Sequence, residues 1–110
     1  MLARYNKYKK SNPEKAREYL LTDLNDTLRR SKPAAYDDED LNPALPSTYR
    51  FMEKVISEIS QMYDEAGLKL NAIHLGGDEV ASNAWTGSPA ARQLVESENL
   101  GSEASLHGYY

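Results

Sequence analysis

The chain has 110 residues, of which 40% are hydrophobic and 27% charged, with a formal net charge of −4 and no cysteine. These are ordinary values for a globular domain. They exclude a disulfide framework and a cysteine-ligated metal site, and no apolar run is long enough to cross a membrane. The length allows one small core but not a complete (β/α)8 barrel, which needs about 250 residues.

Positive charge is concentrated before Pro33, and beyond it only Arg50, Lys54, Lys69 and Arg92 offset the acids. A basic N-terminal arm is one signature of nucleic-acid binding. Here acids interleave with the cations and no reading motif accompanies them. The pattern therefore favours a solvated helical face, and we expect no nucleic-acid partner.

Helices are predicted to open the chain. Residues 1–10 are helix-compatible, and the run Ser11-Asn12-Pro13-Glu14 is a helix start, with a capping side chain followed by proline at the first helical position. A short helix is predicted over residues 14–21.

Residues 22–47 are predicted to be mostly loop, because Asn42-Pro43 and Leu45-Pro46 interrupt any regular element. The acidic run Asp37-Asp38-Glu39-Asp40 lacks the ordered spacing of an EF-hand loop. We therefore expect no metal site there. A connection this long in a compact domain is often functional.

The clearest predicted element is an amphipathic helix that Ser47 or Thr48 caps and Gly67 ends. Its apolar residues recur at three- and four-residue steps. They are Phe51, Met52, Val55, Ile56, Ile59, Met62, Tyr63 and Ala66. This stripe predicts a core face rather than a cofactor site, and a strand follows it directly, as in one helix-to-strand unit of an α/β fold.

Residues 70–75 form a short apolar run that is typical of a strand buried on both faces, as in a parallel sheet. Side chains alternate along a strand. Ile73 and Leu75 are therefore expected to pack against helices, while His74 and Asp78 face a barrel or cleft. The two glycines that follow permit a turn, and that turn is needed for Glu79 to reach the same cleft.

The adjacent carboxylates Asp78 and Glu79 are candidate catalytic residues, because active sites in parallel α/β folds collect at the carboxyl ends of the strands. An ordinary strand-to-loop turn with two solvated acids is the alternative. His74 is more often a satisfied core histidine than a catalytic one in such a position, and we expect it to orient its neighbours.

Beyond the motif, residues 83–89 are predicted to be a loop in which Trp85 has a packing role rather than stacking on a sugar. Pro89 is predicted to open a short helix that runs to about Glu96. A turn over residues 99–102 and the start of another apolar element at residues 106–110 complete the chain.

The run His74-Leu-Gly-Gly-Asp-Glu-Val80, followed by Ala84-Trp85 and Ser88-Pro89, resembles the β-N-acetylhexosaminidases of glycoside hydrolase family 20, in particular their bacterial chitobiase-like branch. Ala81 stands where many relatives have proline. The resemblance extends to Leu21-Thr-Asp-Leu-Asn-Asp-Thr27, Leu41-Asn-Pro-Ala-Leu-Pro-Ser-Thr-Tyr-Arg-Phe51 and Leu106-His-Gly-Tyr-Tyr110. The match thus covers nearly the whole chain.

The resemblance implies that residues 1–110 are part of a (β/α)8 catalytic barrel, cut at both ends and inactive alone. It implies removal of terminal N-acetylglucosamine or N-acetylgalactosamine from oligosaccharides with retention, no cofactor or metal, and a periplasmic or extracellular location. By carry-over, Glu79 is the general acid/base, Asp78 orients and stabilises the substrate acetamido group, and His74 has a supporting role.

The chemistry suits neighbouring carboxylates. A standard retaining glycosidase needs two carboxyls about 5–5.5 Å apart that flank the anomeric carbon, which adjacent residues at one strand end do not easily provide. The requirement disappears if the 2-acetamido oxygen of the substrate is the nucleophile.

Two other readings stay open. A diguanylate-type nucleotide cyclase also carries Gly-Gly-Asp-Glu, but its hairpin needs an apolar strand directly after the motif, and none follows Val80. The second is a small, mostly helical interaction module, without enzymatic activity, that carries the motif by coincidence.

Overall fold

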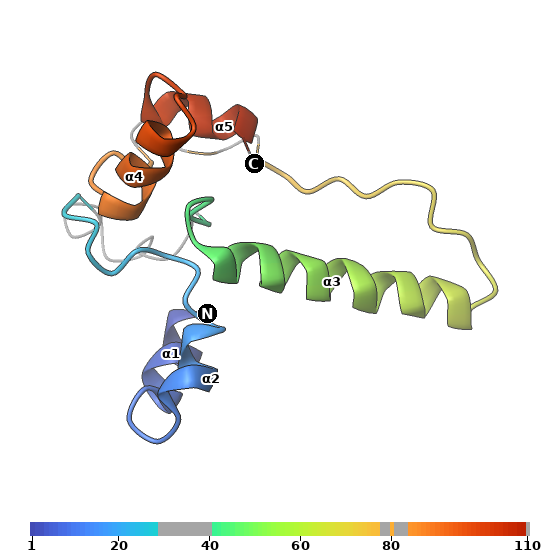
Figure 1. The fold of residues 1–110 in the computed structure, drawn as a ribbon. Helices are drawn as coiled ribbons and strands as arrows, with labels where there is room; N and C mark the ends of the chain where they lie inside the picture. The colour runs from blue at the N-terminus through green and yellow to red at the C-terminus, as the bar shows by residue number, and fades with distance from the viewer. Residues whose placement is uncertain (29–40, 78–79, 81–83, 110) are drawn as a thin grey trace.

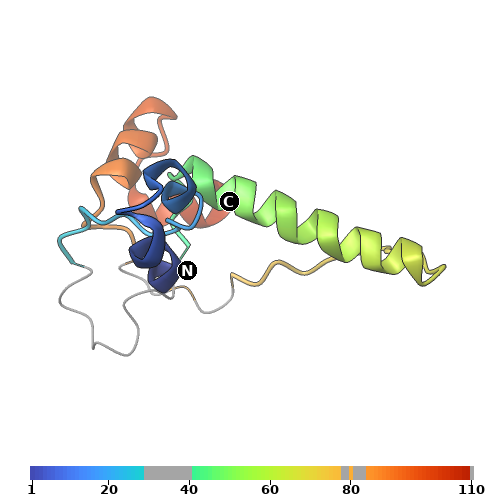
Figure 2. The ribbon, with the colours of Figure 1, turned by 90° about the horizontal axis from the view of Figure 1, so that it is seen from below.

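The computed structural model describes residues 1–28, 41–77, 80 and 84–109. Its helices are α1 (Leu2–Tyr8), α2 (Pro13–Arg17), α3 (Pro46–Glu65), α4 (Pro89–Ser97), the 3-10 turn η3 (Glu103–Ser105) and α5 (Leu106–Tyr109). The 20 residues of α3 make it about 30 Å long. It projects away from the other helices, which gather toward its N-terminal end (Figure 1, Figure 2). In the part of the chain described, no helix has the length and apolar character that a bilayer span requires.

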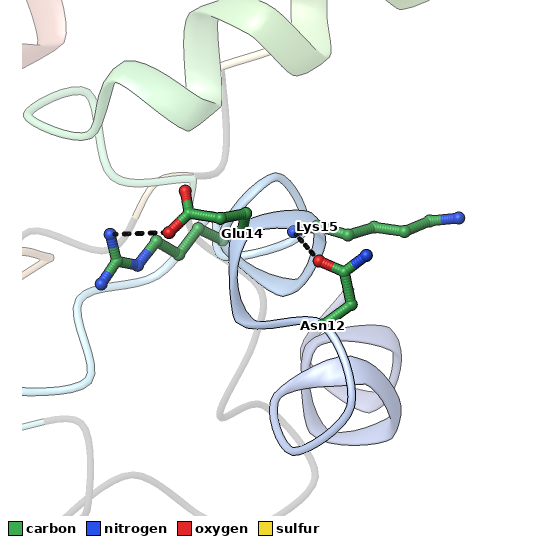
Figure 3. A network of polar contacts seen from close by, with 4 residues as sticks. Asn12, Glu14 and Lys15 are labelled. Carbon is green, nitrogen blue, oxygen red and sulfur yellow. Dashed lines mark hydrogen bonds and ion pairs between the residues drawn. The ribbon is translucent and has the colours of Figure 1, made fainter.

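Helix α2 begins as the sequence predicts. Asn12 is its N-cap, and the Asn12 Oδ1 accepts a hydrogen bond from the backbone N–H of Lys15 at 3.0 Å (Figure 3). Pro13 takes the first helical position, where a missing N–H costs nothing. Glu14 forms an exposed ion pair with Arg17 at 3.8 Å. Each of these features depends on residues within one turn of the chain, which is why the sequence shows them.

The end of α2 differs from the prediction, because the helix stops at Arg17 rather than near residue 21. Beyond it the backbone carbonyls accept tertiary hydrogen bonds. The Ser47 hydroxyl donates to the carbonyl of Leu20, and the Asn42 backbone N–H donates to that of Leu21 at 2.9 Å. These bonds tie the chain after α2 to the segment before α3.

The N-terminal cations lie on an exposed surface, as expected for a solvated helical face. The side chain of Lys15 lies 5.0 Å from the ring centroid of Tyr8, and that ring stacks on Tyr19 with centroids 5.8 Å apart. The 5.0 Å distance is measured to the Lys15 Nζ, so the ammonium group itself lies over the ring in a cation–π contact.

The start of α3 corrects one prediction. Neither Ser47 nor Thr48 caps the helix: Pro46 is its first residue, and Leu45 is an N-cap without a side-chain hydrogen bond. Both hydroxyls donate to backbone carbonyls outside the helix instead, that of Thr48 to Asn42 at 2.7 Å. Both residues are buried, so these bonds satisfy groups that water does not reach.

The C-terminal end of α3 confirms the role of Gly67. Its φ of 68° is left-handed, and the N–H groups of Gly67 and Leu68 donate to the carbonyls of Asp64 and Tyr63 at 3.0 and 2.9 Å. This is a Schellman arrangement, which depends on a residue that tolerates positive φ. The helix therefore ends where the glycine dictates.

The prediction that the apolar stripe of α3 is core is wrong in this structure. None of its apolar side chains is buried, and Met62 and Tyr63 are 67% and 40% exposed. The reason is the projection of α3 beyond the other helices: the described residues supply no sheet to cover the stripe.

The predicted strand over residues 70–75 is also wrong in this structure. The segment runs back along α3 as extended chain (Figure 1), and it makes no backbone hydrogen bond within the described residues. A strand forms only where neighbouring backbone pairs with it. The expected contact with helices is met partly: Leu75 lines an open groove with Tyr49, Met52 and Ile56 of α3, yet it remains 49% exposed.

The apolar core of the described residues is formed near the C-terminal end of the chain. Ala84, Trp85, Ala91 and Leu106 form a buried cluster. Partly buried apolar residues pack against it, namely Ala44, Val80, Leu94, Val95 and Leu100. The predicted helix from Pro89 is confirmed as α4, which contributes Ala91 to the cluster and packs Leu94 and Val95 against it. The cluster thus joins the residue after Glu79 to the two C-terminal helices.

Candidate functional site

The residues directly before the two carboxylates, 74–77, are exposed and belong to no helix or strand. His74 is exposed, and its Nδ1 accepts a hydrogen bond from the backbone N–H of Gly76 at 3.0 Å. Gly76 and Gly77 have φ values of 78° and 96°, which residues with a Cβ rarely adopt. Both glycines therefore take backbone conformations that favour glycine, while the turn that would bring Glu79 to the cleft stays a prediction. Asp78 and Glu79 lie outside the described residues, so their direction relative to a cleft stays a prediction.

The chain beyond the motif is anchored at Trp85. This residue is buried, its Nε1 donates to the carbonyl of Leu41 at 3.0 Å, and its ring lies 5.2 Å from that of His107. The predicted packing role of Trp85 is confirmed. Val80, which directly follows Glu79 in the chain, packs against the same cluster. Val80 is thus packed, whereas residues 74–77, the last described residues before the two carboxylates, are exposed.

A buried polar cluster of Asp23, Asn42, Thr48 and Ser88 holds three distant segments together. The Ser88 hydroxyl donates to the Asp23 Oδ2 at 2.6 Å and accepts from the Asn42 Nδ2 at 3.0 Å. The Asn42 side-chain oxygen accepts from the N–H of Ala44, and its backbone carbonyl accepts from Thr48. Residues separated by up to 65 positions in sequence are thus directly bonded.

Ser88 uses its whole hydrogen-bonding capacity in this cluster. A hydroxyl has one donor hydrogen and two acceptor lone pairs. The hydrogen goes to Asp23, and the lone pairs accept from Asn42 and from the N–H of Ala91, which Ser88 caps at 3.1 Å. The Asp23 Oδ2 also accepts from the N–H of Ala90 at 3.2 Å. The first turn of α4 is therefore closed by a carboxylate as well as a hydroxyl, which suits the positive end of the helix dipole.

Gly87 marks the tightest approach in the turn between Trp85 and α4. A Cβ at this position would lie 2.2 Å from the Asp26 Oδ1 and 2.6 Å from the backbone nitrogen of Leu28. The Gly87 carbonyl accepts from the N–H of Thr27 at 3.1 Å. Residues 26–28 thus lie directly against the turn, and only glycine fits between them.

The described residues hold no group of three histidine, cysteine or carboxylate side chains suited to a metal ion. Residues 84–97 form a turn followed by α4, rather than the second strand that the cyclase hairpin requires. The acidic run at residues 37–40 lies outside the described part of the chain.

Comparison with known proteins identifies the family of the chain. The model of the glycosyl hydrolase family 20 catalytic domain matches residues 4–110. The chain belongs to this family.

Three curated members of family 20 illustrate the relationship. The chain is 38% identical to beta-hexosaminidase B of Pseudoalteromonas piscicida and 37% identical to a beta-hexosaminidase of Vibrio vulnificus, in both cases over its whole length. It is 41% identical to the N,N'-diacetylchitobiase of Vibrio harveyi over 72% of its length. The chain spans only 14%, 13% and 9% of the length of these relatives. No solved structure matches it.

The sequence analysis did not bring Asp23, Asn42, Thr48 and Ser88 together, and the only side-chain role that it gave to any of the four was the helix cap expected of Ser47 or Thr48. A signal for them was present, since all four lie in the segments that carry the family resemblance, Leu21–Thr27, Leu41–Phe51 and Ser88-Pro89. Ser88 before Pro89 is moreover a local N-cap signature. Its bond to Asp23 has no local signature, because it depends on how the loops meet.

Proposed function

We propose that this chain forms part of the catalytic domain of a β-N-acetylhexosaminidase, and that Asp78 and Glu79 are the residues that act on the substrate. The supporting observation is the family 20 match, which runs through both carboxylates from residue 4 to residue 110. The names of the relatives point to the same activity. In this proposal the chain is one part of a (β/α)8 barrel, and the strands of that barrel are completed by other parts of the polypeptide.

In the proposed reaction Glu79 donates a proton to the glycosidic oxygen while the bond from that oxygen to the anomeric carbon breaks. The carbonyl oxygen of the substrate's 2-acetamido group attacks the anomeric carbon and forms an oxazolinium-type ring. Glu79, now ionised, takes a proton from water, whose oxygen opens the ring. Two inversions at the anomeric carbon give net retention, and Glu79 returns to its protonated form.

Asp78 acts on the acetamido group in this scheme. Its ionised carboxylate accepts a hydrogen bond from the acetamido N–H and stabilises the positive charge of the intermediate, which is electrostatic stabilisation of developing charge. His74 supports the motif from the preceding residues, because its Nδ1 accepts a hydrogen bond from the N–H of Gly76. A side chain thereby holds the backbone N–H of Gly76, two residues before Asp78.

The test uses the polypeptide encoded by the whole open reading frame that contains this chain. We expect it to cleave an aryl N-acetyl-β-glucosaminide and to release the β-anomer, while the aryl β-glucoside, which lacks the acetamido group, is not cleaved. Glu79→Gln is expected to lower kcat by about 10²–10⁴-fold, the usual contribution of a general acid/base. Asp78→Asn is expected to lower turnover of the N-acetylated substrate.

A matched control is Asp64→Asn, the same chemical change at an exposed position near the far end of α3. It is expected to leave activity unchanged. Unaltered turnover in Asp78→Asn would contradict the role of Asp78, and equal cleavage of the two sugars would contradict participation of the acetamido group. No cleavage of either sugar by the unaltered protein would favour a non-enzymatic helical module.

A further inference from the structure

Trp85 adopts a backbone conformation that a bulky residue rarely takes. Its φ is 65°, in the left-handed region, where a non-glycine residue costs of the order of 1–3 kcal/mol and is held only by its surroundings. Here the surroundings are specific: the Trp85 Nε1 donates to Leu41, and the Trp85 carbonyl accepts from the N–H of Ser88 at 2.8 Å. The strained residue sits five positions after Val80 in the chain and in the same cluster.

The bonds that hold this turn lead to Asp23. The backbone of Ser88 holds the Trp85 carbonyl, and the hydroxyl of Ser88 gives its single hydrogen to the Asp23 Oδ2. Asp23 is 7% exposed, and its Oδ1 accepts from the N–H of Asn25 at 2.9 Å. The Asp23 carboxylate, which lies far away in sequence, thus helps to hold the turn that contains Trp85.

Val80 connects the turn to the motif. It is bonded to Glu79 through the peptide link and packs against the cluster of Ala84, Trp85, Ala91 and Leu106. A movement of the turn or of the first residues of α4 therefore changes the support against which Val80 rests. One peptide bond joins Val80 to Glu79, so this support lies at the described residue that directly follows Glu79 in the chain.

We propose that Asp23 is a positioning residue for Glu79, acting through Ser88, the Trp85 turn and Val80. This inference rests on the proposed function, in which Glu79 is the general acid/base. It adds to that function a residue that touches neither the sugar nor the reacting atoms.

The hydrogen-bond pattern requires a carboxylate at position 23. Both of its oxygens accept, the Oδ1 from Asn25 and the Oδ2 from Ser88 and Ala90. In Asp23→Asn one oxygen becomes an NH2 group, which would face a donor in either orientation. Ser88 cannot adapt by rotating its hydroxyl, because its lone pairs are occupied by Asn42 and Ala91. The substitution keeps the size of the side chain and removes one acceptor.

The test compares two leaving groups on the same N-acetylglucosamine. A dinitrophenolate leaves without being protonated, whereas a sugar alkoxide needs a proton from Glu79 in the transition state. A misplaced general acid therefore slows the disaccharide more than the dinitrophenyl glycoside. A displacement of about 1 Å costs about 100-fold, so in the whole enzyme we expect Asp23→Asn to lower kcat for the disaccharide by about that factor. For the dinitrophenyl glycoside we expect a loss of less than about tenfold, with KM unchanged in both cases.

Simple loss of folded protein would lower kcat for both substrates by one common factor. An equal loss for the two substrates would therefore overturn the positioning role, and so would an Asp23→Asn enzyme that matches the unaltered one. Asp64→Asn serves as the exposed control and is expected to change neither rate. Absence of activity in the unaltered enzyme would be a failure of the proposed function and is recognised before any variant is compared.

Discussion

Ser88→Ala is the most informative test of the buried polar cluster. Ser88 is fully buried and makes three side-chain hydrogen bonds. Its removal eliminates the N-cap of α4, which is worth about 1 kcal/mol. It also leaves the amide of Asn42, itself 2% exposed, without its acceptor at a cost of about 1–3 kcal/mol. The sum is about 2–4 kcal/mol, a large part of the total stability of a typical domain.

The effect should be local, so the assay is hydrogen exchange by mass spectrometry on the protein from the whole open reading frame. At 1.4 kcal/mol per factor of ten, the opening of residues 84–97 should make exchange about 30- to 700-fold faster. Ser97→Ala is the matched control, since Ser97 lies in the same helix and its exposed hydroxyl donates only to the Leu94 carbonyl. Exchange that rises equally in both variants, or in neither, would refute the assignment of Ser88 as the junction of the three segments.

Two further outcomes are expected. Gly87→Ala places a Cβ 2.2 Å from the Asp26 Oδ1 and against the backbone of Leu28, so it should displace residues 26–28 and destabilise the fold by about 1–3 kcal/mol. Gly108 has open space around it, so the control variant Gly108→Ala should be near neutral. Limited proteolysis of the two variants compares their stabilities. The 110-residue chain by itself should melt broadly and bind a hydrophobic dye, because the apolar side of α3 is not covered. A sharp, cooperative melt without dye binding would show instead that the chain is an autonomous module.

Local features of the fold were predictable because their causes are local. Asn12 before Pro13 starts α2, Gly67 ends α3, and Pro89 opens α4, each through contacts within a few residues. The packing role of Trp85 was also anticipated. The choice of Asp78 and Glu79 as catalytic residues rests on the motif alone, and their geometry relative to the sugar remains a prediction of the sequence.

The errors share one physical cause. Residues 70–75 have the composition of a buried strand, and α3 has the apolar stripe of a core helix, but both need a sheet to complete them. Within the described residues that sheet is not formed, so the segment stays extended and the stripe stays half-exposed. Ser47 and Thr48 show the same dependence at smaller scale. Their hydroxyls were predicted to cap the helix, but they donate to backbone carbonyls of Leu20 and Asn42, outside the helix.

The sequence by itself indicated the family, the starts of α2 and α4, the end of α3 and the two carboxylates that we propose as catalytic, because motifs and local caps are encoded by residues close together in the chain. Only the tertiary structure showed that Asp23, Asn42 and Ser88 meet and that Ser88 has no unused hydrogen-bonding group. The physical reason is that a hydrogen bond across 65 residues is specified by the way in which loops pack together, and no periodicity in the sequence records it.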